Sequence, residues 1–174
     1  MPRRTPHFAF PHGVGCRRAI VITVSDRSAR SERADTSGPR VAALLREHGF
    51  EVVAEAIVPD QPRTLVAALR AASRAAALVV TSGGTGFGPR DHTPEATARV
   101  VERPAPGLSE AMRAAGGRTQ PRAWLSRGIA GLRGRSLILN LPGSPGGAAA
   151  SLAAVIQILP HALDTAAGGD HPEA

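Results

Sequence analysis

A glycine-rich stretch that follows an apolar run constrains the fold of this chain more than any other feature. The run at residues 76–80 is short and β-branched at its end, which is typical of a buried parallel strand. Residues 81–97 follow it directly and carry four glycines within six positions. Glycine tolerates positive φ and lets backbone N–H groups approach an anion. Thr93 and Pro94 then predict a helix with Thr93 as its N-cap, so the stretch predicts an anion site.

The same stretch also has a purely structural interpretation. Glycine-rich connections between strands and helices are common, and Asp91 or Thr93 could serve only as a helix cap. The string matches neither the phosphate loop that ends in Gly-Lys-Ser/Thr nor the dinucleotide pattern Gly-x-Gly-x-x-Gly. All 21 basic residues of the chain are arginine. The absence of lysine therefore excludes both a P-loop lysine and a Schiff-base lysine.

The order of the remaining patterns predicts a three-layer α/β/α sandwich with a mainly parallel sheet and one antiparallel edge hairpin. Strands are expected at 19–24, 51–58 and 76–80, with 51–58 near the sheet edge. A hairpin is expected around residues 133–135, between strands at 124–132 and 136–141. Residues 27–36 are expected to form a loop. Helices are expected at 37–48, about 62–75, from 93, 108–115 with Gly116 and Gly117 as its end, and 145–164 with a kink at Pro160.

Length and composition indicate a single-domain protein. With 174 residues and 43% apolar content, one domain at residues 18–164 can bury a core. Residues 1–17 are expected to be an irregular extension and residues 165–174 a polar tail. The single cysteine, Cys16, excludes an internal disulfide, and no apolar run approaches the ~18 residues that span a bilayer. We therefore expect a soluble cytoplasmic protein without membrane contact.

The net charge of +7 raises the hypothesis of nucleic-acid binding. Residues 111–162 contain no acidic residue but six arginines, and such a segment suits a polyanionic small molecule equally well. An arginine-rich composition can also reflect only a solvated face. No helix-turn-helix, zinc-finger spacing or aromatic-basic pattern is present. The sequence therefore does not favour a nucleic-acid partner.

Three aspartates are expected at the same edge of the sheet, where strands lead into the following segments. They are Asp26, Asp60 and Asp91. Asp60 also has a structural interpretation, because an acid at a helix N-terminus stabilises it by about 0.3–1 kcal/mol. No zinc-ligand spacing and no Gly-x-Ser-x-Gly motif is present. Asp60 and Asp91 beside a glycine cradle suit metal-assisted phosphoryl or nucleotidyl transfer, although spacing alone identifies no metal ligands.

Four separated motifs in one order carry a resemblance to a known family. Residues 81–97, Ile22-Thr23-Val24-Ser25-Asp26, Leu125-Ser126-Arg127 and the segment 139–145 together resemble the molybdopterin adenylyltransferase family. These are the Mog/MoaB-type domains also found in proteins such as gephyrin. The resemblance spans residues 18–163.

This resemblance implies a reaction and a set of site residues. The terminal phosphate of molybdopterin would attack the α-phosphorus of Mg²⁺-ATP and give adenylyl-molybdopterin and pyrophosphate. Asp60 and Asp91 would be catalytic. The substrate-binding residues would be Ser25, Asp26, Gly83, Gly84, Thr85, Gly86, Ser126, Arg127, Asn140, Pro142 and Gly143.

Within that set, Gly83–Gly86 would surround the nucleotide or phosphate, and Ser126 and Arg127 would hold molybdopterin. Both of the latter also have an interpretation as surface residues at the start of a hairpin. The resemblance further implies a homotrimer and hand-over of the product to a molybdenum-insertion protein. One alternative is a non-catalytic molybdopterin-binding or scaffold paralogue of the MoaB type.

Overall fold

The structure is a computed structural model that describes residues 17–169, and its centre is a six-stranded sheet in the order β2-β1-β3-β6-β5-β4. The β1–β2, β1–β3 and β3–β6 pairs are parallel, whereas β5 pairs antiparallel with both β6 and β4. This arrangement confirms the predicted mainly parallel sheet with an antiparallel edge. The strands are β1 (Arg18–Val24), β2 (Glu51–Val58), β3 (Leu78–Ser82), β4 (Arg103–Pro104), β5 (Ala130–Arg133) and β6 (Ser136–Leu141).

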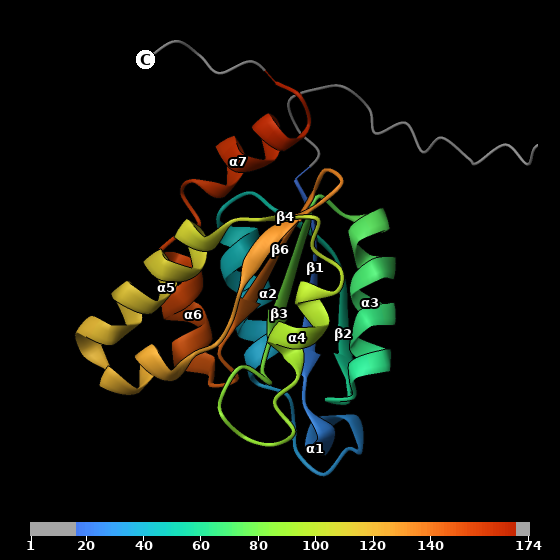
Figure 1. Cartoon of the computed structure of the whole chain (residues 1–174), viewed down its shortest axis with the longest axis vertical. Helices are drawn as coiled ribbons and strands as arrows, with labels where there is room; N and C mark the ends of the chain where they lie inside the picture. The colour runs from blue at the N-terminus through green and yellow to red at the C-terminus, as the bar shows by residue number, and fades with distance from the viewer. Residues whose placement is uncertain (1–16, 170–174) are drawn as a thin grey trace, which may run out of the picture.

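Helices cover both faces of the sheet, which gives the predicted three layers (Figure 1). Helices α2, α5, α6 and α7 share one hydrophobic cluster with the sheet, and α3 and α4 share the other. The helices are α1 (Asp26–Ala29), α2 (Ser37–Glu47), α3 (Pro62–Ala75), α4 (Thr93–Ala98), α5 (Pro106–Thr119), the 3₁₀ helix η1 (Pro121–Leu125), α6 (Pro145–Ala153) and α7 (Leu159–Ala166).

The central strands are apolar throughout because both of their faces are buried. In β3, Leu78 and Val80 pack into the cluster of α2 and α6, whereas Val79 packs into the cluster of α3. Leu139 and Ile138 of β6 divide between the two clusters in the same way. Burying such a side chain contributes about 1.5–3 kcal/mol relative to exposure. The two clusters therefore fix the register that brings the strand ends together.

Two predicted boundaries near the glycine stretch are wrong. β3 begins at Leu78 and runs on to Ser82, because Thr81 and Ser82 pair with Asn140 and Leu141 of β6. Thr93 is the first residue of α4 and is not its N-cap, a position that His92 occupies. The Thr93 hydroxyl instead donates a hydrogen bond to the Gly83 carbonyl at 2.9 Å. The Thr93 hydroxyl, which was predicted to cap α4, therefore binds the glycine stretch instead.

The glycine pair at 116–117 does not end a helix, which contradicts the prediction, since α5 continues to Thr119. A Cβ at Gly116 would lie 2.8 Å from the Ala123 side chain, and one at Gly117 would lie 2.2 Å from Trp124. The glycines therefore allow η1 to pack closely on α5. Residues 121–125 form this 3₁₀ helix, so the prediction of a strand from 124 is also wrong.

The hairpin at 133–135 is confirmed, but three other boundaries differ from the prediction. The expected helix at 145–164 is two helices, and Pro160 lies in the first turn of the second, where its missing N–H costs no helical hydrogen bond. Part of the expected 27–36 loop is helix α1, which Ser25 caps by accepting from Ser28 N at 3.1 Å. β4 lies at a position where no strand was expected.

The expected N-terminal extension lies outside the described residues except for Arg17, as does the end of the expected tail from residue 170 onward. Within residues 17–169, no helix is long and apolar enough to cross a membrane.

Candidate functional site: a glycine cradle between two aspartates

The glycine cradle begins where β3 ends, between the carboxyl ends of β1 and β6. Gly83 has φ +112° and Gly84 has φ +63°, a region that favours glycine. Gly83 N donates to the Leu141 carbonyl at 3.1 Å. A Cβ on Gly83 would lie 2.2 Å from the Val24 carbonyl oxygen. Only glycine can pass between these two strand ends.

Gly84 separates the catalytic candidate Asp60 from the start of α4. A Cβ on Gly84 would lie 2.4 Å from both Asp60 Oδ2 and Thr93 Oγ1. Thr93 N also donates to the Gly84 carbonyl at 3.1 Å. The absence of a side chain at Gly84 therefore brings the Asp60 carboxylate into contact with the cradle.

Asp60 is buried, with 8% of its surface exposed. Its backbone N–H donates to Asp26 Oδ1 at 3.1 Å, and its Oδ1 accepts from His92 N at 3.0 Å. Burial raises the pKa of Asp60, the His92 N–H opposes this, and the negative charges of Asp91 and Asp26 raise the pKa further. The structure therefore brings the three predicted aspartates together and places a destabilised carboxylate at their centre.

Asp91 is enclosed by the rest of the glycine loop. Its Oδ2 accepts from Gly88 N at 2.9 Å. A Cβ at Gly86 would lie 2.8 Å from this oxygen, and one at Gly88 would lie 2.9 Å from it. Asp26 is held differently, since its Oδ2 pairs with Arg90 Nη2 at 2.6 Å. Both oxygens of Asp26 are therefore engaged by the chain, which makes it a support for Asp60 and Arg90.

A pocket of about 390 Å³ opens in front of the cradle. Helix α6 begins at this pocket, and helix N-termini favour anions. Helix α2 also begins here, but the Asp35 carboxylate already accepts from its first N–H groups. Arg33 adds a positive charge to its wall. Four of the predicted site residues line it, namely Ser25, Gly83, Gly84 and Gly143.

The sequence analysis missed a hydroxyl and carboxylate network in this pocket. Asp35 accepts from Thr23 Oγ1 at 2.6 Å and from the Ser37 and Gly38 N–H groups at 2.9 and 3.1 Å. Ser37 Oγ contacts Ser82 Oγ, which donates to the Pro142 carbonyl at 2.9 Å. An aspartate two residues before a predicted helix is a capping signal that could have identified Asp35.

Arg127 holds the glycine loop from the other side. Its backbone N–H donates to the Thr85 carbonyl at 2.9 Å, its Nε donates to the Gly86 carbonyl at 2.7 Å and its Nη2 to the Asp91 carbonyl at 2.7 Å. Its Nη1 pairs with Glu95. Burial raises the pKa of Glu95, but the hydrogen bond and charge of Arg127 outweigh it and lower the pKa below 4.5. In this structure Arg127 therefore fastens the loop that carries Asp91.

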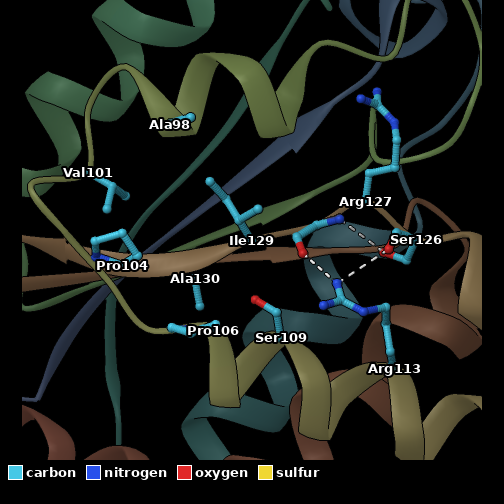
Figure 2. A pocket seen from close by; sticks show the side chains of 11 residues that line it. Ala98, Val101, Pro104, Pro106, Ser109, Arg113, Ser126, Arg127, Ile129 and Ala130 are labelled. Atoms are coloured by element: carbon cyan, nitrogen blue, oxygen red, sulfur yellow. Dashed lines mark hydrogen bonds between the residues drawn. The ribbon is translucent and has the colours of Figure 1, made fainter.

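Ser126 lies at a second pocket, of about 550 Å³, between α5 and β5. Arg113, which the sequence analysis also missed, donates to the carbonyls of Ser126 at 3.4 Å and Gly128 at 2.8 Å. Figure 2 shows that the Arg127 side chain extends away from Ser126 and Arg113, toward the glycine loop. Both residues predicted to hold molybdopterin therefore line this pocket, but the Arg127 guanidinium is bonded to the glycine loop.

Asn140 ties the site together from within the sheet. It is buried, and its Nδ2 donates to Thr81 Oγ1 and Thr97 Oγ1, each at 3.0 Å. Its Oδ1 accepts from Ile129 N at 3.2 Å. The neighbouring Gly143 approaches the cradle so closely that its Cβ would lie 3.2 Å from Gly83 Cα. Asn140 therefore links β6 to β3 and α4, and Gly143 packs directly against the cradle.

This arrangement suits the binding of phosphate groups next to a carboxylate pair. The cradle and the start of α6 favour negative charge, whereas Asp60 and Asp91 favour a cation between them and the ligand. Within residues 17–169, no group of three or more His, Cys, Asp or Glu side chains is arranged to hold a metal ion.

Comparisons with known sequences place this chain in a family. The family described as a probable molybdopterin binding domain matches residues 20–161. A molybdopterin adenylyltransferase from Helicobacter pylori is 36% identical over 152 residues, which cover 85% of this chain and 86% of that protein. A molybdenum cofactor biosynthesis bifunctional protein from Synechococcus elongatus is 40% identical over 88% of this chain. The chain spans only 48% of that relative's length.

Solved structures share the fold. The molybdopterin biosynthesis enzyme MoaB from Thermus thermophilus has a TM-score of 0.82 and 50% identity, covering 87% of this chain and 96% of that one. The molybdopterin biosynthesis Mog protein from Mycobacterium ulcerans has a TM-score of 0.81 and 42% identity, covering 88% of this chain and 98% of that one. The chain therefore belongs to the probable molybdopterin binding domain family, which confirms the resemblance of its motifs.

Proposed function

We propose that this protein acts in molybdenum cofactor biosynthesis and transfers AMP from Mg²⁺-ATP to the terminal phosphate of molybdopterin. The observation that carries the proposal is the glycine cradle at Gly83 and Gly84, which lines a pocket at the start of α6 and leaves room for the Asp60 carboxylate because Gly84 has no side chain. The name of the Helicobacter pylori relative, molybdopterin adenylyltransferase, gives it further support.

In the proposed reaction, a phosphate oxygen of molybdopterin forms a bond to the α-phosphorus of ATP. The bond from this phosphorus to the bridging oxygen of the β-phosphate breaks, and pyrophosphate leaves with the electron pair. The nucleophile is already an anion, so no strong general base is needed. The protein's contribution is to hold both phosphates in line, with N–H groups of the cradle directed at the developing charge.

Magnesium would arrive with ATP, and the residues present fit it. The negative charge of Asp91 raises the pKa of Asp60, and a cation between these carboxylates would relieve that repulsion. Magnesium is usually held by one or two carboxylates together with substrate phosphates, so a larger protein ligand set is not required. Its chemistry here is to neutralise phosphate charge, while Asp60 and Asp91 would orient it.

We propose that the chain forms a homotrimer. We also propose that it hands its product over to a molybdenum-insertion protein. Within residues 17–169, four large apolar side chains are more than half exposed, which supports an interface with other chains. They are Phe87, Trp124, Leu125 and Ile158.

The decisive experiment incubates the protein with molybdopterin and Mg²⁺-ATP and detects adenylyl-molybdopterin by mass spectrometry and pyrophosphate by a coupled assay. Equal amounts of both products are expected. A non-catalytic MoaB-type paralogue would instead bind molybdopterin without releasing pyrophosphate, and that outcome would contradict the proposed transfer.

A further inference from the structure

A third pocket, lined by arginines, lies at the opposite end of the sheet from the glycine cradle. It has a volume of about 300 Å³, and its lining includes Arg70 and Arg74 of α3, Arg99 at the end of α4 and Arg133 of β5. The last turn of α3 leads into the amino end of β3, whereas the cradle follows the carboxyl end of β3 (Figure 1). The two pockets share no lining residue.

The positive charge of this pocket is not balanced by its surroundings. Glu102 is the one carboxylate among the lining residues, and its Oε2 already accepts from Gly134 N at 2.8 Å. The lining therefore carries an excess of three positive charges. Within residues 17–169, none of the pocket's arginines forms an ion pair, since those found there involve Arg30, Arg46, Arg90 and Arg127.

Hydrogen bonds fix one wall of the pocket. Arg133 Nη1 donates to Ser73 Oγ at 3.1 Å, and Ser73 Oγ donates to the Arg70 carbonyl at 3.2 Å. Ser73 is buried, and Arg133 is half-buried. This chain of hydrogen bonds holds the Arg133 guanidinium against the last turns of α3. Arg70, Arg74 and Arg99 line the same pocket with exposed side chains, and a bound anion would offset the repulsion between these like charges.

A helix dipole does not explain the cluster. The C-terminus of α3 favours a cation in its last turn, which accounts for Arg74. It does not account for Arg99 and Arg133, which come from two other elements and line the same pocket. Guanidinium groups present forked donors that match phosphate oxygens. Several of them around one hollow suit a ligand with several phosphates.

We propose that this arginine pocket binds a compound with two or three linked phosphates. Inorganic pyrophosphate and the triphosphate of a nucleotide share this chemistry. The proposal goes beyond adenylyl transfer, because it concerns a separate set of residues and stands whether or not the cradle performs that reaction.

The test is calorimetric titration of the full chain with inorganic tripolyphosphate, with three single substitutions run alongside. Arg99→Ala should weaken one class of site by about tenfold or more, because it removes a charge-assisted contact. Glu102→Gln should strengthen the same class, because it removes the opposing carboxylate. Arg118→Ala is the matched control, since Arg118 is an exposed arginine in the last turn of α5 and lines none of the pockets described above. It should leave binding unchanged.

Two further titrations, with ATP and with DNA, distinguish a nucleotide from a free phosphate chain and either of these from a nucleic acid. Tighter binding of ATP than of tripolyphosphate at the Arg99-sensitive site would identify a nucleotide, and equal binding would identify the phosphate chain alone. Equal weakening by Arg99→Ala and Arg118→Ala would overturn the proposal, because net charge would then hold the anion. A random DNA duplex that displaces tripolyphosphate from this site would also overturn it, in favour of a nucleic-acid surface.

Discussion

At the scale of single residues, the carboxylates beside the cradle are the most informative positions. Asp60→Asn and Asp91→Asn should each reduce turnover by about a hundredfold or more, because the amide keeps the shape but loses the charge that would orient the cation. The amide oxygen can still accept the hydrogen bonds from His92 N and Gly88 N. The fold should therefore persist.

Steady-state pyrophosphate release and a thermal melt check this pair of substitutions. The result that contradicts the catalytic role of Asp60 is near-normal turnover with only slightly lower stability. That result would assign Asp60 to the structural role of stabilising the start of α3, the alternative that its sequence position also allows.

A second prediction at this scale concerns Gly84, where a side chain would cause both backbone strain and a steric clash. Comparison with a second glycine distinguishes the two effects. Gly84→Ala should abolish ligand binding and destabilise the fold, since its Cβ would meet Asp60 and Thr93 at 2.4 Å. Gly134 also has positive φ, +56°, but a Cβ there meets nothing within 4 Å. Gly134→Ala should therefore cost only backbone strain, about 1 kcal/mol.

Calorimetric titration with ATP and thermal melts of both glycine variants provide the measurement. If the two substitutions had equal effects, backbone strain alone would explain the need for glycine in the loop and the contact with Asp60 would be unimportant.

At the scale of elements, Arg127 joins the glycine loop to the segment before β5. Arg127→Ala removes three side-chain contacts with the loop and α4, to Gly86, Asp91 and Glu95. We expect a loss of stability of about 1–3 kcal/mol and faster hydrogen exchange in residues 84–92. Affinities for ATP and molybdopterin should fall together, because the loop serves both.

Hydrogen exchange and two separate titrations test this prediction, with Arg122→Ala of η1 as the control arginine. A loss confined to molybdopterin, with unchanged exchange in the loop, would show instead that Arg127 contacts this ligand directly.

The ion pair between Arg127 and Glu95 should make the stability of the fold depend on pH. The pKa of Glu95 is lower in the folded chain than its ordinary value of 4.5. Such a group stabilises the fold above the unfolded pKa, and the contribution is lost as pH falls through the folded pKa. Glu95→Gln should therefore lower the melting temperature at neutral pH, and this difference should shrink as the pH falls below 4.5 and through the folded pKa. The effect should be small because the Glu95 side chain is 49% exposed.

The measurement is the difference in melting temperature between wild type and Glu95→Gln across this pH range. The other carboxylates are present in both proteins, so their contributions cancel in the difference. A constant difference at all pH values would mean that the charge of Glu95 does not contribute.

At the scale of the whole molecule, assembly is the property to test. A homotrimer predicts a light-scattering mass of three times the 17.9 kDa of the chain. Trp124→Ser should reduce this mass if the exposed surface of η1 forms part of the interface, because it removes an apolar contact. Ile158→Ser, at another exposed apolar position, is the comparison. A monomeric mass for the wild-type chain would contradict the trimer.

Much of this fold follows from the sequence by itself. Continuous apolar runs determined the central strands, and the order of strands and helices determined the layers, because these patterns act over a few neighbouring residues. The glycine content of residues 83–88 likewise predicted an anion cradle, since only glycine populates positive φ freely. The motifs were sufficient to identify the family.

Tertiary structure alone decided how these parts meet. Asp60 binds groups from Asp26 and His92, which lie 34 and 32 positions away in the chain. Arg127 reaches Gly86 across 41 positions. The glycines of α5 looked like a helix end, but they remain helical because η1 packs onto them. Such contacts depend on the packing of both faces of the sheet, and no local pattern of residues encodes them.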